Sequence, residues 1–553
     1  MHVRVFWAWL GLARLCLADH GTLSLRTYRN HEKHAQALRK RDMEHLAKRS
    51  PFTVDLGNID YLGGGFYYVN ASVGTPVQEV QLDIDTGSSD IWMFGVDSCD
   101  QTRFLCAGGV FDESASTSIT IISQGTFKIQ YFTEGSGVTG DYITDNFGIG
   151  TQTINNLTMG VASKAVSVNT GIMGIGFDTN EAAYASDIAH GVTDVPPYAN
   201  LLDVMKSQGL VDSRSYSLYL DDLEAATGSI VFGGYDKAKF QGDLGILDIQ
   251  PNAQTGNYSD FSVILGSVGV TDSSGSTVLT TSNMPNIVIL DSGTAFTIIP
   301  QDLLDEIVSY FGAVNDPTYS YIVRCDLNGM AGTLDYQFAG PSGPVISVPF
   351  SELAVPLLDF QKDTPVPVTD DAGHPICRLG LSAPSTPDEP LLFGDTFLRS
   401  AYVVYDLDNL QIGIAQTLFN VTDSNVQAIT ASEKGQSLPG NVASVLSTPV
   451  LTATQGLNAA PTFASSAAAT NVATAFGTGK GDAALVGVKT SYTNRATNIP
   501  GATTTAQGAG STGKKKNASG PSGKEFAGGW WRGLLVQGVM VTIASLVGAG
   551  LII

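Results

Sequence analysis

The stretch Val80-Gln-Leu-Asp-Ile-Asp85-Thr-Gly-Ser88 determines the fold prediction for this chain, because a second stretch repeats its pattern much further along. The second copy is Ile287-Val-Ile-Leu-Asp291-Ser-Gly-Thr294, and in each copy an apolar strand runs into Asp, a hydroxyl residue and Gly. Apolar residues followed by Gly recur at a distance after each copy, in Gly171-Ile-Met-Gly-Ile-Gly176 and in Leu391-Leu-Phe-Gly394. An internal repeat indicates a duplicated structural unit. We therefore expect two related lobes.

The chain between about Phe66 and Phe419 has the composition of strands and turns. Short runs of Val, Ile, Tyr, Phe and Thr alternate with Gly, Asp, Asn and Ser. Helical periodicity is scarce, and its best candidates are residues 199–208 and 301–311. The predicted fold class is mostly β, with an N-terminal lobe over residues 50–245 and a C-terminal lobe over residues 246–420.

Asp85 and Asp291 each place a carboxyl group where an apolar strand meets a Gly, which allows a close backbone approach. One such site alone would indicate no more than a turn, but two copies in matched contexts indicate a pair. Two carboxyls brought together across a pseudo-twofold axis cannot both ionise freely, so they share one proton. One carboxyl can then act as a base on a water while the other protonates a substrate carbonyl.

The N-terminal region has the features of two segments that are removed during secretion. Residues 1–18 combine an early basic residue, an apolar run and the small residue Ala18, which is typical of a signal peptide. Arg14 interrupts the run, and a membrane span would need about 20 apolar residues. Residues 19–49 hold eight Lys or Arg against four Asp or Glu and end in Lys48-Arg49. This pattern predicts a propeptide closed by a dibasic processing site.

The charge balance indicates which partners the chain binds. The chain has 30 Lys or Arg and 52 Asp or Glu, for a formal net charge of −22, and loss of the basic propeptide makes the remainder more acidic still. We expect the propeptide to dock on the mature chain as an inhibitor, the alternative being a basic leader with no docking role. So acidic a chain argues against nucleic acid as a partner. Protein or peptide substrates are expected, with the chain as a monomer.

Four cysteines remain once Cys16 is removed with the signal peptide: Cys99, Cys106, Cys325 and Cys377. An even number in a secretory context predicts disulfides. Three connectivities are possible, and the sequence spacing favours pairing within each half. On chain-entropy grounds the two bridges would stabilise the fold by roughly 2.5 and roughly 4 kcal/mol, the longer loop contributing more.

The C-terminal region has neither strand pattern nor large apolar residues until its last segment. Residues 421–517 are rich in Ser, Thr, Ala and Gly, which predicts a disordered and O-glycosylated stalk. Residues 518–553 contain a polar spacer and an apolar run from Trp530 to Ile553 with only Arg532 charged. This pattern fits a GPI-attachment signal with Asn517 as the attachment residue, and a tail-anchored helix is the alternative. Other candidate attachment residues are Ser511, Ser519 and Gly520.

Several motifs together resemble the pepsin-like aspartic proteases. They are Asp85-Thr-Gly-Ser-Ser-Asp-Ile-Trp92, Leu290-Asp-Ser-Gly-Thr-Ala295, Tyr68-Val-Asn-Ala-Ser-Val-Gly-Thr-Pro76, Ser207-Gln-Gly-Leu-Val211, Gly228-Ser-Ile-Val-Phe-Gly-Gly-Tyr235 and Phe393-Gly-Asp-Thr-Phe-Leu-Arg-Ser-Ala-Tyr402. The resemblance covers residues 60–418 and implies a bilobal fold, with the active-site cleft between lobes, and endopeptidase activity without a cofactor. The stalk and the GPI-like end further resemble the cell-surface yapsin group of fungal members.

The resemblance also implies roles for the residues next to each Asp. Ser88 and Thr294 hold positions whose hydroxyls bond the outer oxygens of Asp85 and Asp291. Two more hydroxyl residues, Thr86 and Ser292, hold the positions at which the loops brace each other, and Gly87 and Gly293 let both carboxyls lie near one plane. Proton sharing by such a pair is the established behaviour of aspartic proteases, so the mechanism is carried over from the family.

A hairpin flap that covers substrate is implied as well. The family's flap Tyr and its hydrogen-bonding Trp correspond to Tyr131 and Trp92. The segment Tyr131-Phe-Thr-Glu-Gly-Ser136 is one residue longer than the usual pattern. If Glu134 replaces the flap Asp of several fungal relatives, it attracts a Lys or Arg side chain just before the scissile bond; the alternative is an exposed turn acid without a substrate role.

Asp83 is a second acid on the strand of Asp85, and residues two apart share a face. We expect its side chain either near the pair or, as the favoured alternative, in a polar network below the pair in which all hydrogen bonds are formed.

The main alternative function is that of a non-catalytic wall glycoprotein that keeps the protease fold as a binding module. Such a protein would be expected to lose an Asp or the Gly that follows it, and this chain keeps both.

Four sequons, at Asn70, Asn156, Asn257 and Asn420, support passage through the secretory route. Five of the seven His lie in the leader segments, which leaves His190 and His374. The sequence therefore predicts no metal site and gives little support to a Ser-His-Asp or Cys-His nucleophile.

Overall fold

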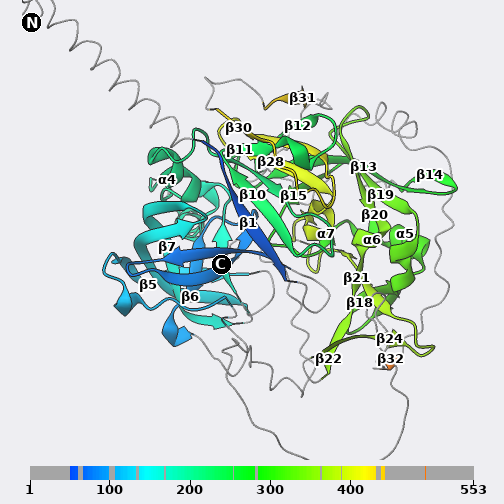
Figure 1. Cartoon of the computed structure of the whole chain (residues 1–553), viewed down its shortest axis with the longest axis horizontal. Helices are drawn as coiled ribbons and strands as arrows, with labels where there is room; N and C mark the ends of the chain where they lie inside the picture. The colour runs from blue at the N-terminus through cyan, green and yellow to red at the C-terminus, as the bar shows by residue number, and fades with distance from the viewer. Residues whose placement is uncertain are drawn as a thin grey trace, which may run out of the picture.

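The computed structural model describes residues 50–59, 66–98, 106, 108–131, 136–166, 168, 170–192, 194–252, 255–279, 284–361, 364–387, 389–430, 438–442 and 492–493. The fold is mostly β, as predicted. Figure 1 shows β5, β6 and β7 on one side of the molecule, β13, β19 and β20 on the other, and β1, β10 and β28 between them. The bounds of these elements follow below.

One sheet of fourteen strands runs through the first side and the middle of the molecule. Its order is β31 (Gly440–Val442), β12 (Leu244–Asp248), β29 (Gln411–Gln416), β28 (Ala401–Asp406), β9 (Ser215–Tyr219), β10 (Thr227–Phe232), β1 (Phe52–Ile59), β2 (Phe66–Val73), β3 (Gln78–Asp85), β8 (Gly171–Gly174), β4 (Ile91–Phe94), β7 (Gln152–Val166), β6 (Gly137–Ile149) and β5 (Thr120–Gln130).

A second sheet forms the other side. Its order is β20 (Val345–Pro349), β19 (Gly332–Phe338), β13 (Ser262–Asp272), β15 (Asn286–Leu290), β27 (Leu392–Phe393), β16 (Thr297–Ile298) and β26 (Leu381–Ser382), with β14 (Gly275–Val278) paired to β13. The smaller sheets are β17 (Val314–Asp316), β18 (Ser320–Arg324), β25 (Ile376–Leu379) and β21 (Ala354–Pro356); β11 (Gly234–Asp236) with β30 (Val426–Ala428); β22 (Leu358–Gln361) with β23 (Thr364–Pro367); and β24 (Thr369–Asp370) with β32 (Tyr492–Thr493).

The repeated sequence motifs form the same substructure twice. Strand β3 ends at Asp85 and pairs in parallel with β8, so that Asp85 lies opposite Gly174. Strand β15 pairs in parallel with β27, so that Leu290 lies opposite Phe393. In each sheet the distant apolar run is therefore the neighbour of the strand that carries the Asp. The duplication inferred from sequence is a duplication of strand pairing.

Helices are short and lie outside the sheets. They are α3 (Ala182–Ala189), α4 (Leu201–Ser207), α5 (Gln301–Phe311), α6 (Phe350–Leu353) and α7 (Asp395–Leu398), with 3₁₀ turns η2 (Val96–Ser98), η4 (Glu113–Ala115), η5 (Asp178–Asn180), η6 (Lys237–Lys239) and η7 (Cys325–Gly329).

Both predicted helices are present. Asn200 and Asp203 form a capping box at the start of α4. Helix α5 ends at Gly312, whose φ of 62° is the left-handed conformation that favours glycine at a helix end. None of the helices in the described part of the chain is long and apolar enough to span a membrane.

The expected boundary between residues 245 and 246 falls inside a strand, β12. Beyond it, β28 and β29 return to the large sheet, where β28 pairs with β9. Strands from both expected lobes thus share one sheet, and this sheet fixes the lobes to each other.

Residues 421–430 and 438–442 are ordered, although the sequence assigns them to the disordered stalk over residues 421–517. Strand β30 pairs with β11, and β31 pairs with β12. The side chains of Ile429 and Leu438 are buried in one cluster with Tyr402. Isolated apolar side chains in a polar segment were enough to order residues 421–430 and 438–442, although the average composition predicted disorder. Apart from residues 492–493, the rest of the predicted stalk and tail lies outside the described residues.

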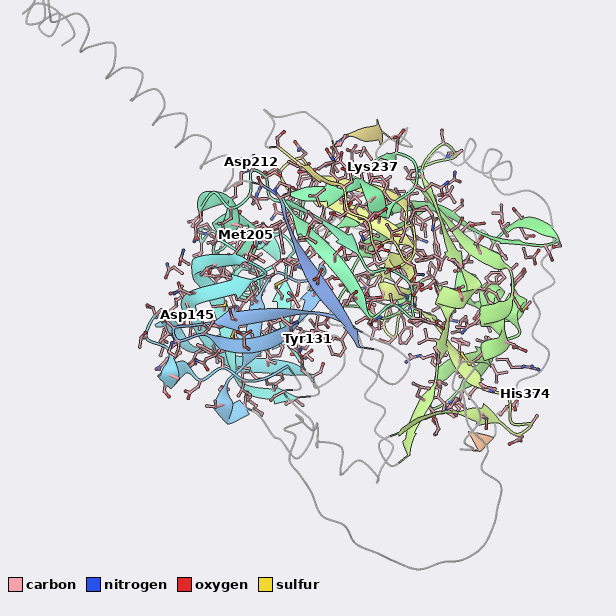
Figure 2. All side chains as sticks on the ribbon, in the orientation of Figure 1. Tyr131, Asp145, Met205, Asp212, Lys237 and His374 are labelled. Carbon is pink, nitrogen blue, oxygen red and sulfur yellow. A yellow bond between two sulfur atoms is a disulfide. The ribbon has the colours of Figure 1, made fainter. Side chains whose placement is uncertain are left out.

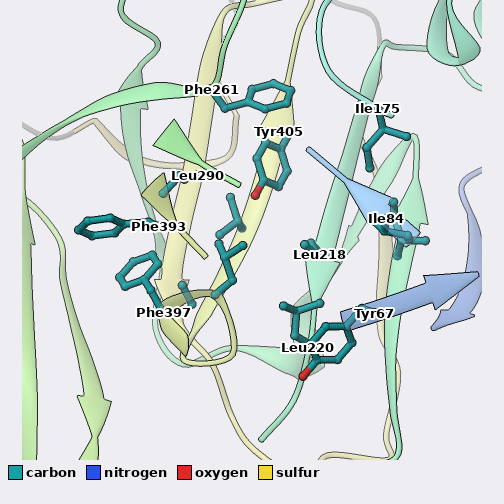
Figure 3. Close-up of a cluster of buried hydrophobic side chains, with 14 of the residues drawn as sticks. Tyr67, Ile84, Ile175, Leu218, Leu220, Phe261, Leu290, Phe393, Phe397 and Tyr405 are labelled. Atoms are coloured by element: carbon teal, nitrogen blue, oxygen red, sulfur yellow. The ribbon is translucent and has the colours of Figure 1, made fainter. Parts of the chain in front are cut away.

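The residues that precede the two Asp, Ile84 and Leu290, are buried in one hydrophobic core. Figure 3 shows Ile84 beside Ile175, and Leu290 near Phe393 and Phe397, with Tyr405 against Phe261. The ring centroids of Phe393 and Phe397 are 4.7 Å apart, and those of Phe261 and Tyr405 are 4.6 Å apart. Close packing leaves the backbone at Ile84 and Leu290 little freedom to move.

The predicted pairing of Cys325 with Cys377 is present as a disulfide, which closes a loop with a sequence separation of 52. Cys106 is buried, while Cys99 lies outside the described residues. The Cys99–Cys106 disulfide therefore stays a prediction.

Candidate active site

Asp85 and Asp291 meet where β3 and β15 end. Both are almost completely buried, at 1% and 0% exposure. A Cβ added to Gly87 would lie 2.5 Å from Oδ1 of Asp291, and one added to Gly293 would lie 2.5 Å from Oδ1 of Asp85. Each carboxyl therefore packs against the glycine of the opposite loop, and only glycine leaves room for it.

Four hydrogen bonds brace the two loops against each other. The backbone N–H of Thr86 donates to Oγ of Ser292 at 3.2 Å, and the N–H of Ser292 donates to Oγ1 of Thr86 at 2.9 Å. The same two hydroxyls donate onward to carbonyls of the opposite strand: Thr86 to Leu290 at 2.9 Å, and Ser292 to Ile84 at 2.7 Å. All of these groups are buried, so their hydrogen bonds are not exchanged for water. The bracing implied for Thr86 and Ser292 is observed.

Each carboxyl also receives two bonds from its own loop. The N–H of Gly87 donates to Oδ1 of Asp85 at 2.8 Å, and the N–H of Gly293 donates to Oδ1 of Asp291 at 2.9 Å. The hydroxyls of Ser88 and Thr294 donate to the Oδ2 atoms of Asp85 and Asp291. The two sets of contacts correspond residue by residue, so the pair is held symmetrically.

The electrostatics of the pair favour a single negative charge. Burial raises the pKa of Asp85 well above its usual range, and the nearby charge of Asp291 raises it further. Burial also raises the pKa of Asp291, but the bonds from Thr294 and from Asp85 offset part of that rise. One proton is therefore retained by the pair as a unit, as expected for two interacting carboxyls.

The hairpin β5–β6 carries Tyr131 at its end, where the Tyr131 N–H donates to the carbonyl of Ser136 at 3.2 Å. Tyr131 and Trp92 belong to one buried cluster with Phe94 and Phe127. Figure 2 places Tyr131 in the N-terminal lobe and His374 at the outer edge of the C-terminal lobe.

The expected Tyr131–Trp92 hydrogen bond is not formed. Burial and then the charge of Asp85 raise the pKa of the Tyr131 hydroxyl. Neither this hydroxyl nor Nε1 of Trp92 has a hydrogen-bond partner. The indole packs on Phe94 at 5.3 Å and on Phe127 at 6.4 Å between ring centroids. The two groups are neighbours in an aromatic cluster, and this ring packing fixes the indole without the expected bond.

Comparison with known proteins decides the family. A model of the family described as "Eukaryotic aspartyl protease" matches residues 66–417. The chain belongs to this family of pepsin-like aspartic proteases. It is an aspartic-type endopeptidase, a hydrolase of peptide bonds.

Named fungal relatives agree with this assignment. The "Probable aspartic-type endopeptidase opsB" of Aspergillus oryzae is 34% identical over 80% of this chain and 88% of that protein. The "Acid protease" of Saccharomycopsis fibuligera is 35% identical over 64% of this chain and 81% of that protein. The "Aspartic proteinase yapsin-3" of Saccharomyces cerevisiae is 29% identical over 66% of this chain and 69% of that protein.

Around the pair, this protease has polar contacts that the sequence did not predict. The Asn180 amide donates to the carbonyl of Gly87 at 3.0 Å. Asp90 accepts from Tyr142 at 3.1 Å, from Tyr198 at 2.8 Å and from the Ala182 N–H at 2.7 Å. These contacts join residues far apart in the chain, and no periodicity or spacing marks them. Only the tertiary structure reveals them.

Other predicted site residues lie away from the pair or outside the described residues. The four sequon residues Asn70, Asn156, Asn257 and Asn420 are exposed, as a glycan would require. His190 and His374 contact local groups, Ser186 and Asp370. Among the described residues no group of three or more His, Cys, Asp or Glu is placed to hold a metal ion. Glu134 and Asn517 lie outside the described residues.

Substituting Gly293 by Ala tests how closely the protease needs its carboxyls placed. The new Cβ would lie 2.5 Å from Oδ1 and 2.6 Å from Cγ of Asp85, so the carboxyl must move. We expect kcat/KM to fall at least about 10²-fold, as for other displacements of a reacting group. Peptide hydrolysis and the thermal unfolding midpoint are both measured for each variant, so that a loss of activity can be separated from unfolding. Gly329→Ala is the control, because an added Cβ there has nothing within 4 Å. Equal activity in the two variants would contradict the packing argument.

Proposed function

We propose that Asp85 and Asp291 hydrolyse peptide bonds by activating one water between them. The observation that supports this most strongly is the mutual bracing of the two loops, which holds both carboxyls buried against the opposite glycines. Such a pair has one proton to donate and one charged oxygen to accept, so it provides an acid and a base at once. No cofactor is needed for this reaction.

The protons balance over the reaction. The ionised carboxyl takes a proton from water as the water oxygen bonds the peptide carbonyl carbon, while the protonated carboxyl gives its proton to the carbonyl oxygen. A hydroxyl of the tetrahedral intermediate then gives its proton to the carboxyl that is now ionised. The other carboxyl gives its proton to the nitrogen, and the C–N bond breaks. The products are a carboxylic acid and an amine, and the pair regains its single proton. Either carboxyl can hold the shared proton at the start, because burial raises the pKa of both and the two titrate as a unit.

The neighbouring residues have supporting roles in this proposal. Thr86 and Ser292 fix the distance between the loops, and Gly87 and Gly293 admit the facing carboxyls. Ser88 and Thr294 orient the outer oxygens. Tyr131 and Trp92 support the hairpin that lies over a bound peptide.

Asp85→Asn and Asp291→Asn test the assignment. Each substitution keeps the shape but removes the shared proton, so we expect kcat/KM for a denatured protein substrate to fall at least about 10³-fold in each. Asp55→Asn, which changes an exposed side chain on β1, is the matched control. Hydrolysis at the wild-type rate by either folded Asn variant would refute the assignment.

We propose further that the protease prefers a basic residue before the scissile bond and that Glu134 provides the preference. The support is its place in the segment between Tyr131 and Ser136, at the end of the β5–β6 hairpin, and the attraction between opposite charges.

Peptides that differ only in Lys or Leu at that position test the preference. We expect kcat/KM to favour Lys over Leu, and we expect Glu134→Gln to lower the Lys-to-Leu ratio by about tenfold, which corresponds to ~1.4 kcal/mol. Glu113→Gln, at another acid on the same lobe, should leave the ratio unchanged. A Lys-to-Leu ratio that survives Glu134→Gln would assign the preference elsewhere.

We propose that the protease reaches the cell surface as a GPI-anchored protein after losing the signal peptide, and that the basic propeptide inhibits it until cleavage at Lys48-Arg49. The support is the composition of residues 1–49 and 421–553 together with four exposed sequons.

Treatment of intact membranes with a phosphatidylinositol-specific phospholipase tests the anchor. We expect release of active protease into the supernatant. Retention after treatment, with release by detergent alone, would indicate a spanning tail; recovery without any treatment would indicate a freely secreted enzyme.

A further inference from the structure

Asp83 occupies an unusual place for an acid. It lies on β3 between Tyr68 of β2 and Ile172 of β8, two residues before Asp85. Since alternate residues of a strand point to the same face, Asp83 and Asp85 stand side by side on one face of β3. Asp83 is only 5% exposed. A third carboxyl is therefore buried beside the catalytic pair.

Asp83 does not lie in a satisfied polar network, contrary to the expectation from sequence. Its Oδ1 atom is buried and has no hydrogen-bond partner, and the same holds for Oδ1 of Asp395 at the start of α7. Buried polar atoms are nearly always paired, and the backbone N–H of Ile84 is the one donor that acts on the Asp83 carboxyl among the causes of its pKa shift. An ionised carboxylate with an unpaired buried oxygen is disfavoured.

The groups that face Asp83 add to this difficulty. Asp395 of α7, Asp85 of its own strand and Asp291 after β15 are all acids, and Tyr131 at the end of the β5–β6 hairpin faces it too. The charge of Arg399 acts on Asp395, but Glu352 already holds Arg399. Nε of Arg399 donates to Oε2 of Glu352 at 2.5 Å, and Nη2 donates to the Glu352 carbonyl at 3.0 Å. Arg399 and Glu352 are both buried, so this ion pair does not rearrange easily.

The neutral form of Asp83 is the one that this site accommodates. Burial, followed by the charges of Asp395, Asp85 and Asp291, raises the pKa of Asp83 well above its usual range. At acidic pH the Asp83 carboxyl is neutral and leaves the single negative charge to the pair. At higher pH an ionised Asp83 would place a second negative charge beside that of the pair.

We propose that Asp83 sets the upper pH limit of the active enzyme: the protease works while Asp83 is protonated and loses activity as Asp83 ionises. This inference rests on the proposed roles of Asp85 and Asp291. Because the folded-state pKa lies above that of the unfolded chain, the stability contributed by protonated Asp83 is complete at low pH. It declines as pH rises toward the folded-state pKa. Activity and stability should therefore decline together on the alkaline side.

The test compares pH profiles of kcat/KM and of the thermal midpoint for the wild type, Asp83→Asn and Asp83→Leu. Both variants replace the acid by a neutral side chain of similar size. We expect the alkaline midpoint of each profile to move up by about one pH unit, a typical effect of a nearby buried charge, while the acid midpoint stays in place. The exposed Asp55→Asn variant should move neither midpoint.

Each other outcome overturns the proposal. A lower acid midpoint in Asp83→Asn would mean that Asp83 is charged in the working enzyme. An unchanged alkaline midpoint would mean that another group sets the limit. Failure of both neutral variants to fold would mean that the ionised carboxylate is required. Loss of the proposed catalytic roles is detected separately, because Asp85→Asn would then remain active whatever Asp83 does.

Discussion

The hydrogen bonds that cross between the loops at Asp85 and Asp291 are the interaction on which the rest of the structure depends. Two buried acids repel each other as soon as both ionise, so loops that were free to move would separate. Thr86 and Ser292 oppose this separation by bonding backbone groups of the opposite strand. The shared sheet, in which β28 pairs with β9, opposes it on a larger scale. The geometry of the Asp pair is therefore a property of both lobes together.

The same burial raises the pKa of several other acids. Burial raises the pKa of Asp260 to about 6 and, with the charge of Asp90 as a further cause, that of Glu181 to about 11. Since these folded-state pKa values exceed the unfolded ones, the stability that they contribute is present at low pH and declines as pH rises through them. Asp408 differs, because bonds from Lys206 and Arg214 outweigh its burial and lower its pKa. The positively charged donors thus favour the ionised form of Asp408, whereas burial favours the neutral form of the acids at the pair.

The sequence predicted what depends on local pattern. The repeat around Asp85 and Asp291 predicted the paired strands, and apolar spacing predicted α4 and α5, because both signals lie within a few residues. The return of β28 to the large sheet depends on contacts between distant segments, and so does the missing Tyr131–Trp92 bond. Residues 421–430 and 438–442 have a polar composition, yet Ile429 and Leu438 order them by packing in one cluster with Tyr402. The sequence placed Asp83 on the same strand face as Asp85, but only the structure shows which acids surround it.

The central claim is that Asp85 and Asp291 hold one proton between them, and neutron diffraction at the pH of maximal activity tests it most directly. The account predicts a single deuterium between the facing carboxyls, with the Ser88 and Thr294 hydroxyls pointing at their outer oxygens. Two deuterium atoms on the pair, or none, would contradict it.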